Sequence, residues 1–385
     1  CMIARSDEAK SLGIQMGRPV FEVSEIIEKE GVHIFSTNYA LYGDISQRVM
    51  NALAESVPDL EIYSIDEAFI DLSGIPESSI YTLAITLKNK IRQWTGIPVS
   101  IGIGQTKTLA KLANHIAKSD AIHKNVYSFV GNSSTDKVLG QTPVNDIWGV
   151  GEKYEAFFER TGIHNAYDLK NTDMNRIREK LGIVGQRLVL ELKGTVCYPL
   201  NQNPDTKKEI CTSRSFGRPL TTLSELEQAT TTYVGKVARK LRKQKSLAQS
   251  ILIFIMTNKY AAGPQYVNYK IVKLPVPTNQ SQELIHFSII ALKSLYREGF
   301  RYKKCGAIVS DVIPEESFQS ALWDTSGRGK KRKLMETIDR INADAGPDTI
   351  KFAVQGSEDN WKMRQLNLSP RYTTRWEDIP AVNMD

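Results

Sequence analysis

The stretch from Tyr63 to Leu72, YSIDEAFIDL, constrains its own part of the fold more than any other feature of the chain. It consists of two short apolar runs with the acids Asp66 and Glu67 between them. Short apolar runs around a polar break are typical of paired strands. The two acids are therefore expected to project together from a tight connection between strands.

Two carboxylates at one point suit a hard divalent cation such as Mg²⁺, which takes oxygen ligands and shares them with substrate phosphates. Asp66 and Glu67 are thus candidate metal ligands. Acids also become adjacent by chance, and 43 acids among 385 residues predict about five such pairs. The pair gains meaning only from the segments around it.

The segment from Lys107 to Lys118 has the pattern of an amphipathic helix. Its apolar residues form one stripe, and the opposite face carries Lys107, Lys111, Asn114 and Lys118. Such a face is often merely solvated, but beside a metal-binding pair it can hold a triphosphate through point charges. No G-x-x-x-x-G-K-[ST] string occurs, so Walker-type ATP hydrolysis is unsupported.

The remaining pattern predicts an α+β multidomain chain. Helix and strand periodicity alternate up to about residue 138, and short helices separated by glycines follow up to about residue 200. A polar linker precedes a second α+β region that ends near Val312, and a basic run and a helix follow it. The expected elements are helices at 83–94, 107–118, 223–245 and 334–342, and strands at 99–103, 210–216 and 251–257.

Charge favours a polyanion as the partner of this chain. The net charge is +7, and six cations lie within the ten residues from Lys236 to Lys245, on one side of an expected helix. Gly149 and Gly151 form a Gly-x-Gly turn before another expected helix, where backbone N–H groups can grip a phosphate. An ordinary turn and a solvated helix face are the alternatives.

Four strings in this order and spacing, SIDEAF, GIGQTKTLAKLANHIAK, IWGVG and TSRSFG, resemble the Y family of translesion DNA polymerases. The strings QTKTLAKLANH and LSPRYTTRW are similar to its bacterial UmuC branch, the catalytic subunit of DNA polymerase V. The resemblance covers nearly the whole chain. It implies error-prone, template-directed nucleotidyl transfer in SOS repair and mutagenesis.

The family resemblance implies a right-hand polymerase of palm, fingers and helical thumb, with a little-finger domain and a C-terminal tail. The expected divisions are fingers at 1–38, palm at 39–140, thumb with a helix-hairpin-helix at 141–200, linker at 201–208, little finger at 209–312 and a partly flexible tail at 313–385.

The same resemblance assigns site residues. Asp66 and Glu67 would bind two Mg²⁺ ions, and Lys118, Lys10 and Arg5 would contact the incoming nucleotide. The residues expected to track the DNA backbone without reading sequence are Gly149, Gly151, Ser213, Arg214, Lys236, Arg239, Lys240 and Lys243.

One departure from the family pattern concerns the metal site. Family members have a palm strand of the form D-x-N-A-F-Y, whose aspartate is a third metal ligand and whose aromatic residue excludes ribonucleotides. No such string occurs in this chain, which begins at Cys1. We therefore expect these 385 residues to lack the first catalytic aspartate and to polymerise weakly or not at all by themselves.

The expected partners are primer–template DNA, dNTP, a UmuD′-like dimer, a RecA filament and a sliding clamp. The clamp would bind a short peptide formed by Gln319, Leu322 and Trp323, although such strings also occur by chance. No apolar run of about 18 residues predicts a membrane span, and a cytoplasmic, nucleoid-associated bacterial protein is expected. The alternative functions are a catalytically silent DNA-binding or recruitment protein on the same scaffold and, more remotely, an RNA-binding regulator.

Overall fold

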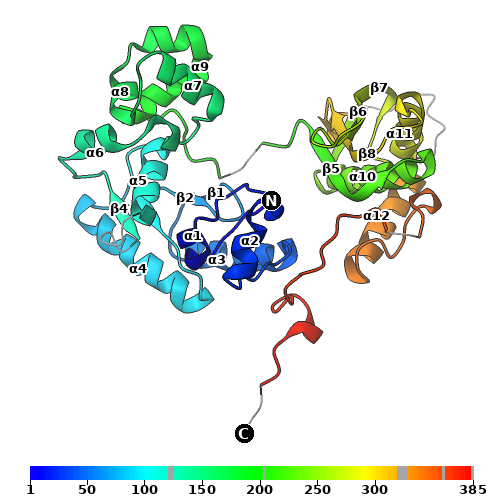
Figure 1. Cartoon of the computed structure of the whole chain (residues 1–385), viewed down its shortest axis with the longest axis horizontal. Coiled ribbons are helices and arrows are strands. Elements are labelled where there is room, and N and C mark those ends of the chain that lie inside the picture. The colour runs from blue at the N-terminus through cyan, green and yellow to red at the C-terminus, as the bar shows by residue number, and fades with distance from the viewer. Residues whose placement is uncertain (120–124, 203–204, 319–327, 358–359, 383–385) are drawn as a thin grey trace. The chain divides into compact units, whose positions relative to one another are not determined.

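The computed structural model describes the chain except residues 120–124, 203–204, 319–327, 358–359 and 383–385 (Figure 1). The chain divides into two compact units. The first unit contains Cys1–Pro204 together with Asn367–Asp385, and the second contains Asp205–Leu366. The chain therefore passes from one unit to the other twice, and the first passage falls within residues 201–208. The finer boundaries of fingers, palm and thumb stay predictions.

Two small sheets lie in the first unit. β1 (Leu60–Ile62) pairs antiparallel with β2 (Ala68–Ile70), and β3 (Ile101–Ile103) pairs parallel with β4 (Val126–Ser128). The expected hairpin around the two acids and the expected strand near residue 101 are confirmed. The helices of this region are α1 (Asp7–Ser11), α2 (Ser24–Lys29), α3 (Tyr39–Ala54), α4 (Glu77–Thr95) and α5 (Lys107–Ser119).

Short helices follow in the first unit, as the sequence predicts: α6 (Thr135–Gln141), α7 (Glu152–Arg160), α8 (Ala166–Asn171) and α9 (Met174–Leu192). Glycines with positive φ separate or kink them, because L residues with a Cβ rarely adopt that conformation. Gly149 has a φ of 95° and Gly182, inside α9, a φ of 68°. Phe158 and Leu169 are fully buried in the core that these helices share with α5.

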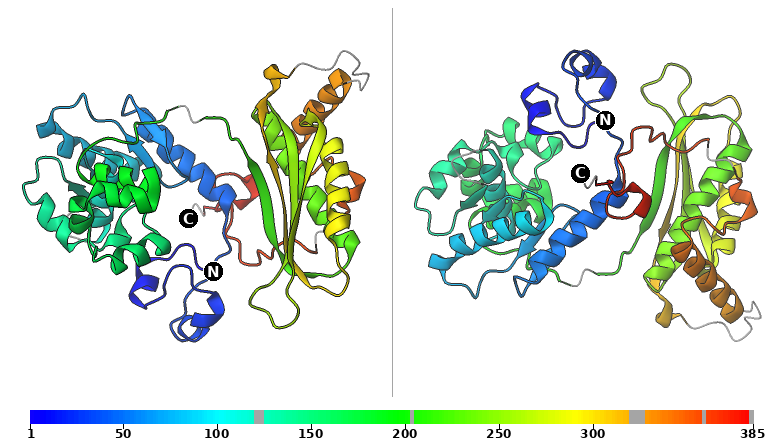
Figure 2. Two further views of the ribbon diagram at one scale, coloured as in Figure 1. Left: turned by 90° about the horizontal axis from the view of Figure 1, so that it is seen from above. Right: turned by 90° about the horizontal axis from the view of Figure 1, so that it is seen from below.

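The second unit is a sheet in the order β5-β8-β6-β7 with helices against it (Figure 2). The strands are β5 (Ile210–Leu220), β6 (Ser246–Thr257), β7 (Val267–Thr278) and β8 (Tyr302–Ser310), and the short β9 (Ile313–Pro314) pairs with β6. α10 (Leu223–Lys243) and α11 (Ser281–Leu295) bury their apolar stripes in the core. Thr222 and Glu225 form a capping box that begins α10.

The expected tail at 313–385 is not one unit. α12 (Arg328–Asp344) lies in the second unit, where Asp339 pairs with Arg242 of α10. Trp361, only 2% exposed, completes the core of that unit. From Asn367 onward the chain belongs to the first unit, and the Asn38 side chain donates to the Ser369 carbonyl at 2.9 Å. Buried, long-range contacts therefore hold parts of the expected tail, and its extent as a domain stays a prediction.

Candidate functional site

The two acids lie on the turn that joins β1 to β2. The backbone N–H groups of Tyr63 and Ser64 both donate to the Glu67 carbonyl at 3.0 Å, which closes the turn. Asp66 is exposed and accepts a 2.5 Å hydrogen bond from the Ser64 hydroxyl, whereas Glu67 is half-buried. The hairpin therefore presents two neighbouring carboxylates, as the sequence predicts.

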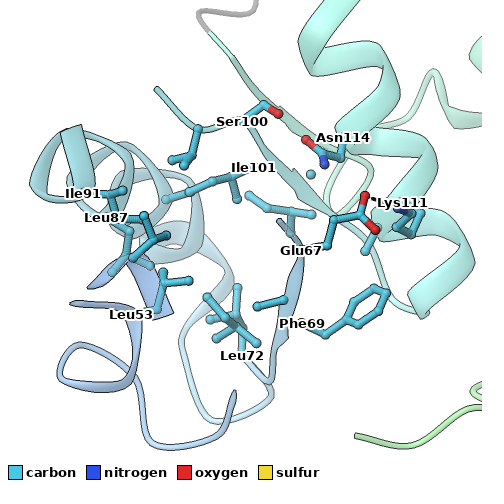
Figure 3. Close-up of a pocket in the computed structure, with 18 of the residues that line it drawn as sticks. Leu53, Glu67, Phe69, Leu72, Leu87, Ile91, Ser100, Ile101, Lys111 and Asn114 are labelled. Carbon is cyan, nitrogen blue, oxygen red and sulfur yellow. Dashed lines mark hydrogen bonds and ion pairs between the residues drawn. The ribbon is translucent and has the colours of Figure 1, made fainter. Parts of the chain in front are cut away.

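α5 faces this hairpin with two of its lysines. The Lys111 ammonium forms an ion pair with Glu67, and the Glu67 and Lys111 side chains point toward one another (Figure 3). One turn earlier, Lys107 pairs with Glu61 of β1 at 2.5 Å. The structure thus brings the predicted carboxylate pair and the predicted basic helix face together. It also shows a partner, Glu61, that the sequence pattern did not indicate.

A cavity of about 170 Å³ opens beside the two acids. Asp66, Glu67, Lys111 and Asn114 line part of it, while apolar side chains of α3, α4, β2 and β3 line the rest (Figure 3). β2 and β3 belong to different two-stranded sheets, so each has a strand edge without a sheet partner among the described residues. The cavity thus combines an apolar interior with a charged rim.

An aromatic cluster that the sequence analysis missed supports the hairpin from the side of the short helices. The Trp148 ring lies 5.7 Å from Tyr63, 6.0 Å from Phe69 and 6.1 Å from Tyr198, measured between ring centroids. Tyr63 and Phe69 are themselves 5.6 Å apart. Aromatic pairs at these separations contribute roughly 0.5 to 1.5 kcal/mol each beyond their buried area. The IWGVG string, in addition to its turn, therefore supplies the central ring.

The predicted nucleotide contacts are less concentrated. Lys118 is exposed at the end of α5, two turns beyond Lys111. Lys10 is exposed and pairs with Asp7 at 2.7 Å, and Arg5 donates to the Ile14 carbonyl at 2.8 Å. The described contacts of Arg5 and Lys10 are thus local, and their role at the nucleotide stays a prediction.

The predicted DNA contacts fall in both units. In the first, Gly149 and Gly151 are exposed, and Gly151 immediately precedes α7. In the second, Arg214 is exposed and Ser213 half-buried on β5, while the four predicted cations of α10 are exposed. Arg242, which the sequence pattern grouped with them, is an exception, because it is only 11% exposed and bonded to Asp339. It is therefore not available to a phosphate.

Burial and neighbouring charges shift the pKa of two groups among these residues. Lys240 is exposed as a whole, but partial burial of its ammonium, with help from the charge of Lys207, lowers its pKa; that ammonium donates to the Cys211 carbonyl and the Thr212 hydroxyl. Burial also raises the pKa of the Cys197 thiol, and the charge of Glu191 adds to this rise.

Within the described residues, no group of three or more His, Cys, Asp or Glu side chains is placed to hold a metal ion. Asp66 and Glu67 supply two carboxylates. No helix in the described part of the chain is long and apolar enough to cross a membrane. The predicted clamp residues Gln319, Leu322 and Trp323 lie outside the described residues.

Comparison with known proteins identifies relatives along nearly the whole chain. Residues 1–115 match the impB/mucB/samB family, residues 207–322 match its C-terminal domain, and residues 332–382 match a domain of unknown function. Protein UmuC of Salmonella typhimurium is 40% identical over 388 residues, 99% of this chain and 92% of that protein. Protein ImpB of the same species is 38% identical over 389 residues, 100% of this chain and 92% of the relative.

Solved structures add the fold. A Y-family DNA polymerase chimera aligns with a TM-score of 0.61 at 18% identity, covering 80% of this chain and 86% of the other. An insertion ternary complex of Dbh DNA polymerase aligns with a TM-score of 0.50 over the same shares. The predicted fold class, an α+β right-hand polymerase, is confirmed. Because relatives this similar extend along nearly its whole length, the chain belongs to the impB/mucB/samB family.

Proposed function

We propose that this chain is an error-prone translesion DNA polymerase of SOS mutagenesis, which transfers nucleotides from dNTP to a primer under the direction of a template. The observation that carries the proposal is the carboxylate pair Asp66 and Glu67 on a strand turn, facing Lys111 of α5. The assignment of the chain to the impB/mucB/samB family supports it.

The donor set of the hairpin fits a divalent cation. Both side chains offer carboxylate oxygens, and Mg²⁺ is commonly bound through one or two carboxylates, with substrate phosphates and water completing its shell. Glu67 already forms an ion pair with one cation, the Lys111 ammonium, at this point. When bound, the cation would activate the primer oxygen and neutralise phosphate charge. Asp66 and Glu67 would hold it.

Positioning and charge are the main tasks of the remaining residues. The primer 3′-hydroxyl loses its proton to water as its oxygen attacks the α-phosphorus of the nucleotide. The new P–O bond forms, and pyrophosphate leaves with the electrons of the broken P–O bond. Lys111 and Lys118 lie on one face of α5 and would offset the triphosphate charge as point charges. Lys10 and Arg5 would contribute from the first α-helix and its preceding loop.

A third carboxylate would complete the metal site. We assign it to a D-x-N-A-F-Y strand absent from these 385 residues. The cavity between β2 and β3 supports this, because its walls are apolar, both strand edges beside it are open among the described residues, and the acids lie at its rim. Primer extension with Mg²⁺ should therefore appear when such a strand is added. Robust extension by the 385 residues alone would overturn this part of the proposal and leave the polymerase assignment standing.

DNA would be held mainly through its backbone. The turn at Gly149 and Gly151 offers N–H groups before α7, and Arg214, Ser213 and the exposed cations of α10 offer charge and hydroxyl contacts. Such contacts are independent of sequence, which suits a polymerase that copies damaged templates. The UmuD′-like dimer, the RecA filament and the sliding clamp are proposed as partners on family grounds alone.

The decisive experiment replaces both acids by their amides, Asp66→Asn with Glu67→Gln, in the chain that carries the added strand. We expect primer extension to fall by at least roughly 100-fold, because the charge that holds the cation is lost while side-chain shape is kept. DNA affinity, measured by fluorescence anisotropy, should stay within about twofold.

The matched control is Asp71→Asn. Asp71 lies one residue beyond β2 and bonds to Ser73 instead of lining the cavity, and it should leave extension unchanged. Extension that survives the double substitution would sink the assignment. Loss of DNA binding together with activity would show that the hairpin acts on structure, not on chemistry.

A further inference from the structure

A single glutamate of α9, Glu191, holds two separate segments, the beginning of α5 and residues 197–198. Glu191 is an acid, yet it is fully buried, and apolar residues flank it in the sequence. One of its carboxylate oxygens accepts from the Thr108 N–H at 3.0 Å. The other accepts from the N–H groups of Cys197 and Tyr198 at 2.7 and 3.2 Å. Both oxygens therefore have donors, as burial of a charged group requires.

The first of these contacts fixes the beginning of α5. Thr108 lies in the first turn of that helix, where N–H groups have no partner within the helix and an acid is favourable. The Thr106 hydroxyl donates to the Glu191 carbonyl at 2.9 Å and accepts from the Leu109 N–H at 3.2 Å. Side chain and backbone of Glu191 thus hold the same end of α5, the helix that carries Lys107 and Lys111.

The second contact fixes the segment that leads away from α9. The chain reverses at Gly194, whose φ is 89°, and a Cβ there would lie 2.7 Å from the Gln105 side chain. The reversal brings Tyr198 back to Glu191, and the Tyr198 ring packs on Trp148. Trp148 contacts Tyr63 and Phe69 on either side of the carboxylate turn.

We propose that Glu191 is a positioning residue that sets the basic face of α5 and the carboxylate turn in register with each other. This inference rests on the proposed polymerase function, but the junction that Glu191 forms between α5 and residues 197–198 is a property of the described structure. Small displacements of catalytic groups are costly, since about 1 Å can reduce a rate roughly 100-fold. Glu191 touches neither substrate nor cation, so its effect passes through Lys111 and the aromatic cluster.

The test is Glu191→Gln, which keeps the side-chain shape but replaces one acceptor oxygen by an NH₂ group. That group then faces backbone N–H groups that are themselves donors. In the chain with the added strand, we expect the single-turnover rate of nucleotide incorporation to fall by roughly 10- to 100-fold, with DNA affinity within about twofold. In the 385-residue chain, the ¹⁹F signal of 5-fluorotryptophan at position 148 should shift or broaden. Trp148→Phe assigns that signal. Glu191→Asp, which keeps the acceptors, should recover part of both properties.

Glu179→Gln is the matched control, because Glu179 lies on α9 but is 71% exposed, and it should change neither the rate nor the signal. If Glu191→Gln fails to fold, Thr106→Val removes one hydroxyl at the same junction and should move both readouts in the same direction by less. An unchanged rate and an unshifted Trp148 signal in folded variants would overturn the proposal. If Glu191→Gln shifts the Trp148 signal but the parent chain with the added strand shows no primer extension, the junction is supported and the polymerase function is refuted instead.

Discussion

Removal of the Asp339 carboxylate should destabilise the second unit by about 2 kcal/mol. The Arg242 guanidinium bonds both Asp339 oxygens, at 2.6 and 2.9 Å, and also donates to the Asn279 carbonyl and the Ser281 hydroxyl. Arg242 is 11% exposed and Asp339 24%. Breaking a fully buried pair costs roughly 3 to 5 kcal/mol, and partial exposure together with the two surviving hydrogen bonds reduces that loss.

The measurement is urea unfolding of Asp339→Ala, followed by hydrogen exchange of peptides from β6, which report on the second unit alone. With a denaturant slope of about 2 kcal/mol per molar urea, the midpoint should fall by about 1 M. Glu336→Ala is the control, because the Arg332–Glu336 pair on the same helix is 60% and 57% exposed and should contribute less than about 0.5 kcal/mol.

A combined Arg242→Met and Asp339→Leu variant sharpens the argument. Apolar side chains of similar volume remove both charges together, so this variant should lose less stability than Asp339→Ala alone. A loss below about 0.5 kcal/mol for Asp339→Ala, with an unchanged slope, would refute the packing of α12 on α10.

Three further predictions concern other groups. Burial raises the pKa of the Cys305 thiol to about 12, so at pH 8 it should react with a disulfide reagent only after unfolding, whereas the exposed Cys211 should react at once in a timed thiol assay. Asn38→Ala removes the side chain that holds Ser369, so proteolysis followed by mass spectrometry should show faster cleavage after residue 367. Burial raises the pKa of Glu225, but hydrogen bonds from Arg218 and Thr222 outweigh burial, so the pKa is lowered overall. The stability it adds is therefore complete above its ordinary value of 4.5 and is lost as pH falls through the lower folded value. Glu225→Gln should flatten the acid side of the stability profile of the second unit; an unchanged profile would contradict this.

The sequence by itself determined the local elements of the site. Asp66 and Glu67 lie on a turn because apolar runs flank them, and period-2 and period-3.6 patterns are properties of a short stretch of chain. The basic face of α5 follows from the same periodicity. The string resemblance extended this local reading to the family, because its motifs recur in order and spacing along nearly the whole chain.

Tertiary structure decided which charges meet and which are buried. Lys107 pairs with Glu61, and Lys111 pairs with Glu67. The register between β1 and β2 places these two acids, and both strands lie far from α5 in sequence. Periodicity places Arg242 on a solvated face, yet it is buried in an ion pair with Asp339, 97 residues later.

Glu191 shows the limit of local patterns most clearly. An acid inside the apolar run LVLELK signals an unusual position, but its donors come from residues up to 83 positions away. The division of the tail likewise depends on Asn38 and Ser369, 331 residues apart. Hydrophobic periodicity records which face of an element turns away from water, whereas the identity of the partner depends on how distant segments pack, and only the folded chain brings those segments together.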